Sequence, residues 1–140
     1  MDERTAILQD LRERVAASAF HAGLGLRIED AGRGEVRLSL EAKPEHLNLQ
    51  GLVHGGVLAT VADTAMGLAI RTALQPGRRH VTIELGVHYL RPAREGRLSA
   101  VGTVVRIGSQ VAFAEAQVHD ERGRLLARAS GTFSVTGAAS

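Results

Sequence analysis

The sequence predicts an α+β domain in which one antiparallel β-sheet curls around a buried helix. Residues 81–135 alternate apolar and polar side chains between short turns, a pattern typical of strands. Residues 55–74 have a helical period and are apolar on nearly every side. Because such a helix must be buried, we expect the sheet to wrap around it. A chain of 140 residues is the size of one domain, here residues 1–140.

Two strands and a first helix are predicted before the long helix. Residues 2–19 carry apolar side chains at steps of three and four, which predicts an amphipathic N-terminal helix. Alternation with a period of two covers residues 24–28, and it resumes at residues 36–40 after the turn AGRG. A loop with Pro44 then leads to the long helix.

Four strands are predicted after the long helix. The first of them, VTIELGVHYL, places Val81, Ile83 and Tyr89 on one face and Thr82 on the other. Because only short turns separate the four strands, we expect them to form an antiparallel meander. Their predicted positions are residues 81–90, 98–107, 111–119 and 125–135.

Composition excludes several classes of function. The net charge is only +2, and the chain has no cysteine, which excludes disulfides and Cys-ligated metals; we predict no metal site. With three Phe, one Tyr and no Trp, the chain lacks the basic stripe with interleaved aromatics that nucleic-acid binding requires. It has no apolar signal region and no run of eighteen apolar residues, so we expect a soluble, cytoplasmic protein that does not bind membranes.

The motif His54-Gly55-Gly56 stands at the start of the long helix. The first amide groups of a helix have no internal partner and carry partial positive charge. Glycine allows another group to approach them closely. The motif therefore predicts a site for a developing oxyanion or a phosphate, with a plain turn as the alternative interpretation.

Asp63 interrupts the apolar helix with a carboxylate. No Lys or Arg stands three or four residues away, and an ionised carboxylate among apolar groups is unfavourable unless paired or solvated. Asp63 therefore either bonds a neighbouring strand or partner, or acts as a nucleophile or general base. We expect its side of the helix to face away from the sheet, on a polar stripe formed by Thr60, Asp63, Thr64, Gly67 and Arg71.

The spacing of these groups predicts a homodimer. Asp63 lies seven residues after Gly56, which is roughly 10–12 Å along the helix axis. A nucleophile and its oxyanion donor must both lie about 3 Å from one reacting centre. Asp63 would therefore act with the helix start of a second copy, placed antiparallel across a two-fold axis.

The pattern Asn48–Gly51–His54-Gly55-Gly56–Asp63, followed by VTIELGVHYLRPAREG, resembles the hotdog-fold thioesterases over nearly the whole chain. It is most similar to the phenylacetate-pathway and thioesterase-superfamily-member-2 branch. The resemblance implies a hotdog fold, dimers that usually form homotetramers, and hydrolysis of an aryl- or medium-chain acyl-CoA to the free acid and CoA. Coenzyme A is then part of the substrate, and no separate cofactor is implied.

The resemblance also implies roles for individual residues. The Gly55 N–H would polarise the thioester carbonyl, with the Asn48 side chain nearby. Asp63 of the other subunit would attack or activate water, and Thr82 would help to place that water. His54 lies beside the site and either acts directly or holds the loop through hydrogen bonds.

At the positions that would contact the rest of the substrate, this chain departs from the pattern of the hotdog-fold thioesterases. Many relatives carry Arg or Lys after Gly108, where this chain has Ser109 and Gln110. Other arginines would then have to meet the coenzyme A phosphates, with Arg78 and Arg79 as one pair of candidates. The residues predicted to bind substrate are Gly56, Thr64, Arg91 and Arg94.

Two alternative functions stay open. A hotdog enoyl-CoA hydratase or dehydratase would pair a catalytic His with an acid, usually at a longer separation than that between His54 and Asp63. A non-catalytic acyl-CoA-binding module would be stabilised by ligand without releasing a thiol. The presence of Asp63, rather than an inert residue, argues against the second alternative.

Overall fold

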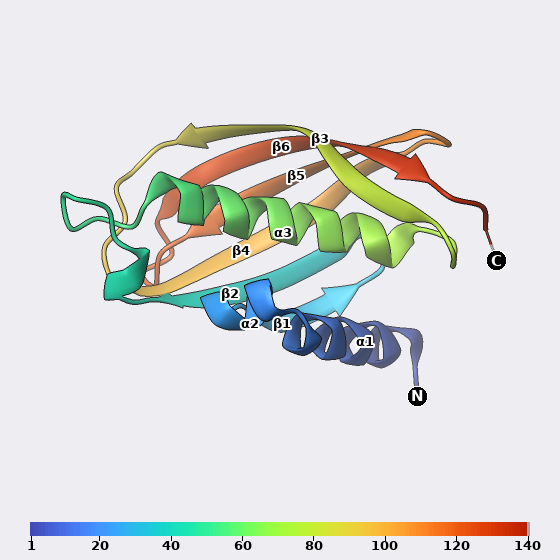
Figure 1. Ribbon diagram of the computed structural model, residues 1–140, viewed down its shortest axis with the longest axis horizontal. Helices are drawn as coiled ribbons and strands as arrows, with labels where there is room; N and C mark the ends of the chain where they lie inside the picture. Colours follow the sequence, from blue (N-terminus) through green and yellow to red (C-terminus); the bar gives the residue numbers. More distant parts are fainter. Residues whose placement is uncertain (140) are drawn as a thin grey trace.

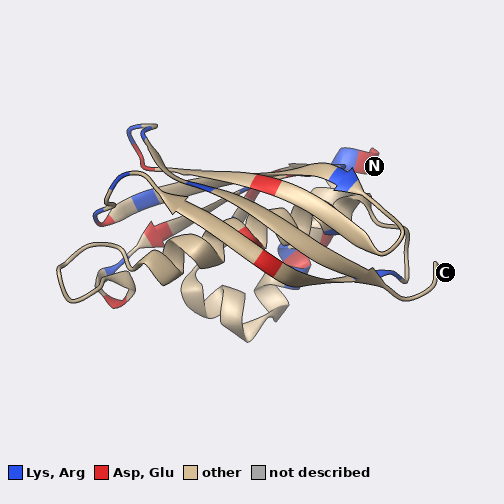
Figure 2. Ribbon diagram, turned by 90° about the horizontal axis from the view of Figure 1, so that it is seen from above, with Lys and Arg blue, Asp and Glu red and all other residues tan. Residues whose placement is uncertain are grey.

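The computed structural model describes residues 1–139, and it confirms the expected α+β architecture of a curved sheet around a central helix (Figure 1). One face of the sheet holds the long helix, α3, as the view turned by 90° shows (Figure 2). The elements in chain order are α1 (Glu3–Ala17), α2 (Ala19–Leu24), β1 (Arg27–Gly32), β2 (Glu35–Ala42), the short 3-10 helix η1 (Pro44–His46), α3 (Gly55–Ala73), β3 (Arg79–Tyr89), β4 (Gly96–Ile107), β5 (Val111–His119) and β6 (Leu125–Thr136).

The six strands are antiparallel and lie in the order β1-β2-β4-β5-β6-β3. The predicted four-stranded meander is therefore wrong for β3, although β4, β5 and β6 do form a meander. β2 occupies one edge of β4 and β5 occupies the other, so β4 has no free edge for β3. β3 pairs instead with β6 and becomes the second edge strand of the sheet.

A β-bulge in β3 changes which side chains face the helix. The register with β6 shifts between Thr82 and Glu84, and an inserted residue of this kind switches the alternation of faces. As a result Thr82 faces α3, whereas Val81 and Ile83 are 62% and 60% exposed. The predicted grouping of Val81 and Ile83 on one face with Tyr89, which contacts α3 at Gly55, is therefore wrong.

The N-terminal segment also differs from its prediction. The strand expected over residues 24–28 begins only at Arg27, because a second helix, α2, occupies the preceding residues. The Ser18 side chain accepts a hydrogen bond from the His21 N–H and caps α2, and Gly25 ends it in the left-handed region at φ +82°. Helix α1 packs against β1, with Leu11 and Val15 buried (Figure 1).

Helix α3 fills the concave face of the sheet. Its core-facing side chains are fully or almost fully buried, among them Val61, Met66 and Ile70. At Gly102 of β4 the helix backbone lies so close that a Cβ would overlap the Ala65 carbonyl group and stand 2.7 Å from the Met66 nitrogen. No helix within residues 1–139 has both the length and the apolarity needed to cross a bilayer.

The close contact at Gly102 predicts a large effect of one added methyl group. Gly102→Ala must push α3 away from β4, and we expect it to lower the free energy of unfolding by about 3 kcal/mol, the upper end of the usual overpacking range. Urea denaturation measures this change. Gly23→Ala is the matched control, because a Cβ there meets nothing within 4 Å. Equal stability of the two variants would contradict the packing described here.

Candidate active site

The loop before α3 is held in one conformation by Asn48. Its side-chain Oδ1 accepts hydrogen bonds from the Gln50 and Leu52 amides at 2.9 and 3.1 Å. Its backbone N–H donates to the Leu52 carbonyl at 2.7 Å, and Gly51 takes a positive φ of 78°. The Asn48 carboxamide oxygen thus orders the loop, and its half-buried side chain bonds within that loop.

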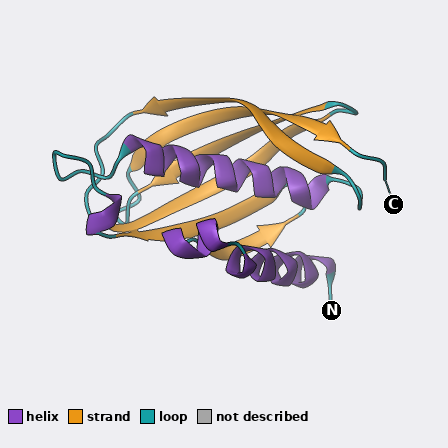
Figure 3. Cartoon of the chain, viewed as in Figure 1, coloured by secondary structure: helices purple, strands orange, loops and turns teal. Residues whose placement is uncertain are grey.

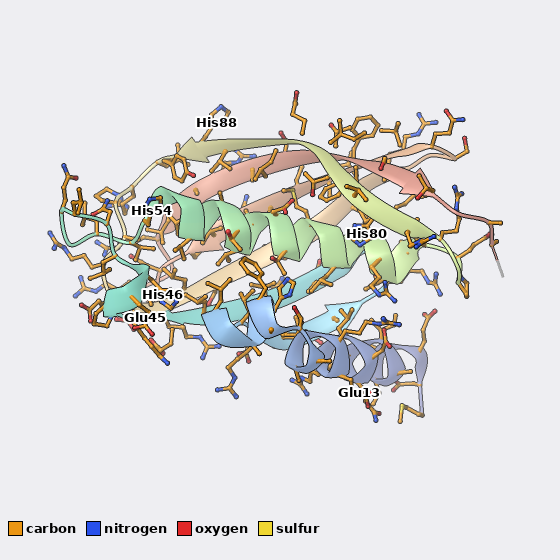
Figure 4. The ribbon with its side chains drawn as sticks, viewed as in Figure 1. Glu13, Glu45, His46, His54, His80 and His88 are labelled. Atoms are coloured by element: carbon orange, nitrogen blue, oxygen red, sulfur yellow. The ribbon has the colours of Figure 1, made fainter. Side chains whose placement is uncertain are left out.

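His54 is the N-cap of α3. Its Nδ1 accepts a hydrogen bond from the Gly56 N–H at 2.8 Å, and its carbonyl accepts from the amides of Val57 and Leu58. The His54 N–H itself donates to the carbonyl of buried His46 at 2.9 Å. Figure 4 shows His54 at the beginning of the helix. His54 therefore holds the loop through hydrogen bonds, one of its two predicted roles. Because the Gly56 N–H donates to His54, that amide is not free to bind another group.

Gly55 carries the free donor at this helix start. Its N–H has no hydrogen-bond acceptor among residues 1–139, because it precedes the intrahelical bonds of α3. Its carbonyl accepts a hydrogen bond of 2.7 Å from the hydroxyl of Tyr89 at the end of β3. The Tyr89 ring also stands over Gly55, where an added Cβ would lie 3.3 Å from the ring carbon Cζ. Sequence analysis placed Tyr89 only on an apolar strand face and missed this contact.

Asp63 is half-buried and bonds to the edge strand. Its Oδ1 accepts a hydrogen bond from the Thr82 hydroxyl at 2.9 Å, so two residues predicted from the sequence do meet in the fold. One helical turn further on, Gly67 is covered by the ring of His80, with 3.1 Å between the position of a Cβ and His80 Cε1. This part of the polar stripe therefore faces β3, and the prediction that it faces away from the sheet is wrong here.

Thr60 and Thr64 of the stripe are half-buried, and within residues 1–139 neither hydroxyl bonds to the sheet. The Thr60 hydroxyl donates to the Gly56 carbonyl of its own helix at 2.8 Å. Thr64 is half-buried, and its hydroxyl has no protein partner among residues 1–139. Thr64 therefore presents a polar group on the same helix as Asp63, where a bound molecule can contact it.

One protomer does not bring Asp63 and Gly55 together. Eight residues of continuous helix separate them, which corresponds to about 12 Å along the axis. The free Gly55 amide and the Asp63 carboxylate therefore lie at two separate places along one helix. No group of three or more potential metal ligands occurs within residues 1–139.

Arg91 and Arg94 lie at the end of the sheet where α3 begins. The connection from β3 to β4 is tied to the loop before α3 by a hydrogen bond of 2.8 Å from the Val53 N–H to the Ala93 carbonyl, and the two loops run side by side in Figure 3. Both arginines line an open groove of about 540 Å³ together with Arg122. Within the described residues, none of these three guanidinium groups has a carboxylate partner.

Arg78 occupies the opposite end of the molecule. Its guanidinium donates to the Ser109 carbonyl at 2.9 Å, which fixes the turn between β4 and β5 to the start of β3. This bond makes Arg78 a structural residue within the protomer. A larger hollow of about 700 Å³ lies on the outer face of the sheet, between Arg37 and Arg128, and no predicted site residue lines it.

Comparison with known proteins identifies the family. The model of the Thioesterase superfamily matches residues 50–127, which include the helix start, Asp63 and Thr82. The chain belongs to the Thioesterase superfamily. Its fold is the hotdog fold of that superfamily, and it is a thioester hydrolase, as the resemblance implied.

Relatives of this thioesterase cover most of its length. A putative esterase of Halobacterium salinarum is 45% identical over 84% of this chain and 78% of its own. The medium/long-chain acyl-CoA thioesterase YigI of Escherichia coli is 31% identical over 83% and 84%. A thioesterase structure from Haemophilus influenzae superposes with a TM-score of 0.85 at 25% identity, covering 93% and 90% of the two chains. The E. coli PaaI protein shares the fold, with a TM-score of 0.89 at 22% identity over 99% of each chain.

The burial of His80 predicts a pH-dependent stability of the thioesterase. Burial, helped by the nearby Arg71 guanidinium, lowers the pKa of His80 from its ordinary value of 6.5, against the opposing effect of Asp63. The unfolded chain then binds more protons than the native state as the pH falls through 6.5. We expect the free energy of unfolding to fall between pH 7.5 and pH 5, and His80→Gln to reduce this slope. Urea titrations at several pH values measure both, and identical slopes would contradict the expectation.

Proposed function

We propose that this thioesterase hydrolyses the thioester bond of an acyl-CoA. The observation that carries the proposal is the combination of one free amide, that of Gly55, with a carboxylate, Asp63, held by Thr82. A medium-chain acyl group is the best-supported class, because relatives over 30% identical are named medium/long-chain acyl-CoA thioesterases. Coenzyme A is part of the substrate, and the proposal includes no separate cofactor.

The Gly55 amide acts in this proposal as the oxyanion donor. Negative charge develops on the thioester oxygen when a nucleophile adds to the carbonyl carbon. An amide aimed at that oxygen stabilises the transition state, and a single donor of this type is typically worth about 2.7–4 kcal/mol. The partial positive charge at the start of α3 acts in the same direction.

Asp63 supplies the base or nucleophile. As a base it takes a proton from a water molecule while the water oxygen bonds to the carbonyl carbon. The tetrahedral intermediate then collapses, the carbon–sulfur bond breaks, and the CoA thiolate leaves and is protonated. If Asp63 attacks directly, an anhydride forms first, and water hydrolyses it to the same acid. In both routes Thr82 positions the Asp63 carboxylate through its 2.9 Å hydrogen bond.

The two halves of the site come from different subunits in this proposal. An antiparallel homodimer places Asp63 of one copy against the Gly55 amide of the other. The uncovered side of α3 and the exposed Val81 and Ile83 of the edge strand β3 are available for that contact. Assembly of two dimers into a tetramer, which the family resemblance implies, stays a prediction.

The first test asks whether catalysis depends on the Gly55 N–H. Gly55→Pro replaces the amide hydrogen with a ring carbon at the first position of the helix, where proline is well tolerated, and the Cβ that it adds 3.3 Å from the Tyr89 ring is matched in the control below. The preceding His54 already has a ψ of 135°, which suits a residue before proline. We expect kcat to fall roughly a hundredfold or more in thiol-release assays, relative to the control Gly55→Ala, which keeps the amide. Asp63→Asn should show a similar loss while the variant still folds and binds substrate.

Mixing the two inactive variants tests whether the site is shared. If Asp63 and Gly55 act from different subunits, a mixed dimer of Asp63→Asn and Gly55→Pro contains one intact site. Refolding the variants together in equal amounts should then restore about a quarter of wild-type activity. Absence of any recovery in a demonstrated mixed dimer would place both groups in one subunit and refute the shared site. A product formed by hydration of an enoyl-CoA would favour the hydratase alternative.

The groove beside the helix start provides a second test, on the substrate. We expect Arg91 and Arg94 to meet coenzyme A phosphates, because both guanidinium groups line the groove without a carboxylate partner among residues 1–139. Replacing both by Ala should raise KM for an acyl-CoA about tenfold, and less at high salt. Turnover of the acyl-N-acetylcysteamine thioester, which lacks the phosphates, should not change.

The control for this test is Arg106→Ala, an exposed arginine of β4. It removes a guanidinium from the same sheet without touching the groove. Equal KM changes in the control and the double variant would show a general charge effect. Equal losses with both substrates would remove Arg91 and Arg94 from the phosphate contacts.

A further inference from the structure

The two peptide groups around Gly55 are bonded at three of their four polar positions. In the first, the His54 carbonyl accepts from the amides of Val57 and Leu58, at 2.9 and 3.3 Å, and the Gly55 N–H is free. In the second, the Gly55 carbonyl accepts from Tyr89, and the Gly56 N–H donates to His54 Nδ1. Within residues 1–139, the Gly55 amide is therefore the one polar group of these two peptides that is left for a ligand.

A pair of glycines needs such restraint to work as an oxyanion donor. Glycine has more backbone freedom than any other residue. An amide that changes orientation no longer points its hydrogen at the oxyanion. The donor has to lie within about 2.7–3.1 Å of the place where the oxyanion forms. His54 restrains the amide side of the Gly55–Gly56 peptide from within the helix. Tyr89 restrains the carbonyl side from outside it, 34 residues further along the chain.

Tyr89 makes this contact although it is not part of the hydrophobic core. Its side chain is 53% exposed, and it is not among the buried residues that pack the sheet against α3. Its ring nevertheless stands over Gly55, 3.3 Å from the position of a Cβ, and closes the space on that side of the glycine. The last residue of β3 thus connects the edge strand to the helix start through one side chain.

We propose that Tyr89 is a positioning residue for the thioesterase reaction. Its hydroxyl holds the Gly55 carbonyl and its ring limits the movement of Gly55, so that the free amide keeps the orientation needed by the thioester oxygen. This inference rests on the proposed function of the Gly55 amide. Tyr89 does not touch the reacting atoms, and it acts only through Gly55.

Tyr89→Phe tests the hydroxyl alone. We expect kcat to fall about tenfold with KM nearly unchanged, because the bond affects the transition state more than substrate binding. Tyr89→Ala, which also removes the ring, should lower kcat further. The Gly56 amide should exchange its hydrogen faster in both variants, since the peptide it belongs to loses the hydrogen bond that Tyr89 donates from outside the helix. Leu90→Ala, an equally exposed neighbour, is the control and should leave kcat and exchange unchanged.

A double-mutant cycle separates this inference from the proposed function. In the Gly55→Pro background the donor is absent, so Tyr89→Phe should cause no further loss of kcat. If Tyr89→Phe reduces kcat equally in both backgrounds, Tyr89 acts elsewhere, and the inference fails while the donor role of Gly55 stands. If Tyr89→Phe has wild-type kcat and exchange, the inference also fails. If Gly55→Pro retains wild-type turnover, the donor role itself fails.

Discussion

The contact between α3 and the concave face of the sheet is the constraint on which the other features depend. Gly102 lets the helix backbone approach β4 more closely than any side chain would allow. This contact sets the position of the whole helix, and therefore of the free Gly55 amide at its start and of Asp63 two turns later. Because both groups sit on one rigid helix, they cannot move toward each other. The proposed site therefore needs a second copy of the chain to bring the two groups together.

Hydrogen bonds at the start of α3 leave the Gly55 amide without a partner among residues 1–139. His54, Asn48 and Tyr89 satisfy the surrounding polar groups, and each belongs to a different part of the structure: the cap, the loop and the edge strand. Within the described residues the Gly55 amide alone among the first four amides of α3 has no protein partner, which leaves it open to a ligand, as is usual for the first amide of a helix. The same end of the sheet carries the unpaired arginines of the groove. The groove arginines and the amide that we propose as the oxyanion donor therefore lie at the same end of the molecule.

The edge strand β3 links structure and proposed activity. Its bulge directs Thr82 to Asp63, its last residue reaches Gly55, and His80 covers Gly67. β3 therefore contacts α3 at the start, the middle and the C-terminal half of the helix. Pairing with β6 on only one side leaves its other edge and two apolar side chains exposed. This arrangement suits a strand that supports a site at the contact between two copies.

Local features of this protein were determined by the sequence alone: the long buried helix, the strands, the cap motif and the isolated carboxylate. These features can be predicted from the sequence because helical periods, alternation and capping depend on residues close together in the chain. The tertiary structure decided the strand order, the bulge in β3, the second helix α2, and the contacts of Thr82 and Tyr89. Thr82 meets Asp63 and Tyr89 meets Gly55 across 19 and 34 residues. Such contacts depend on which strand edges remain free after the sheet assembles, and no local pattern of residues specifies that.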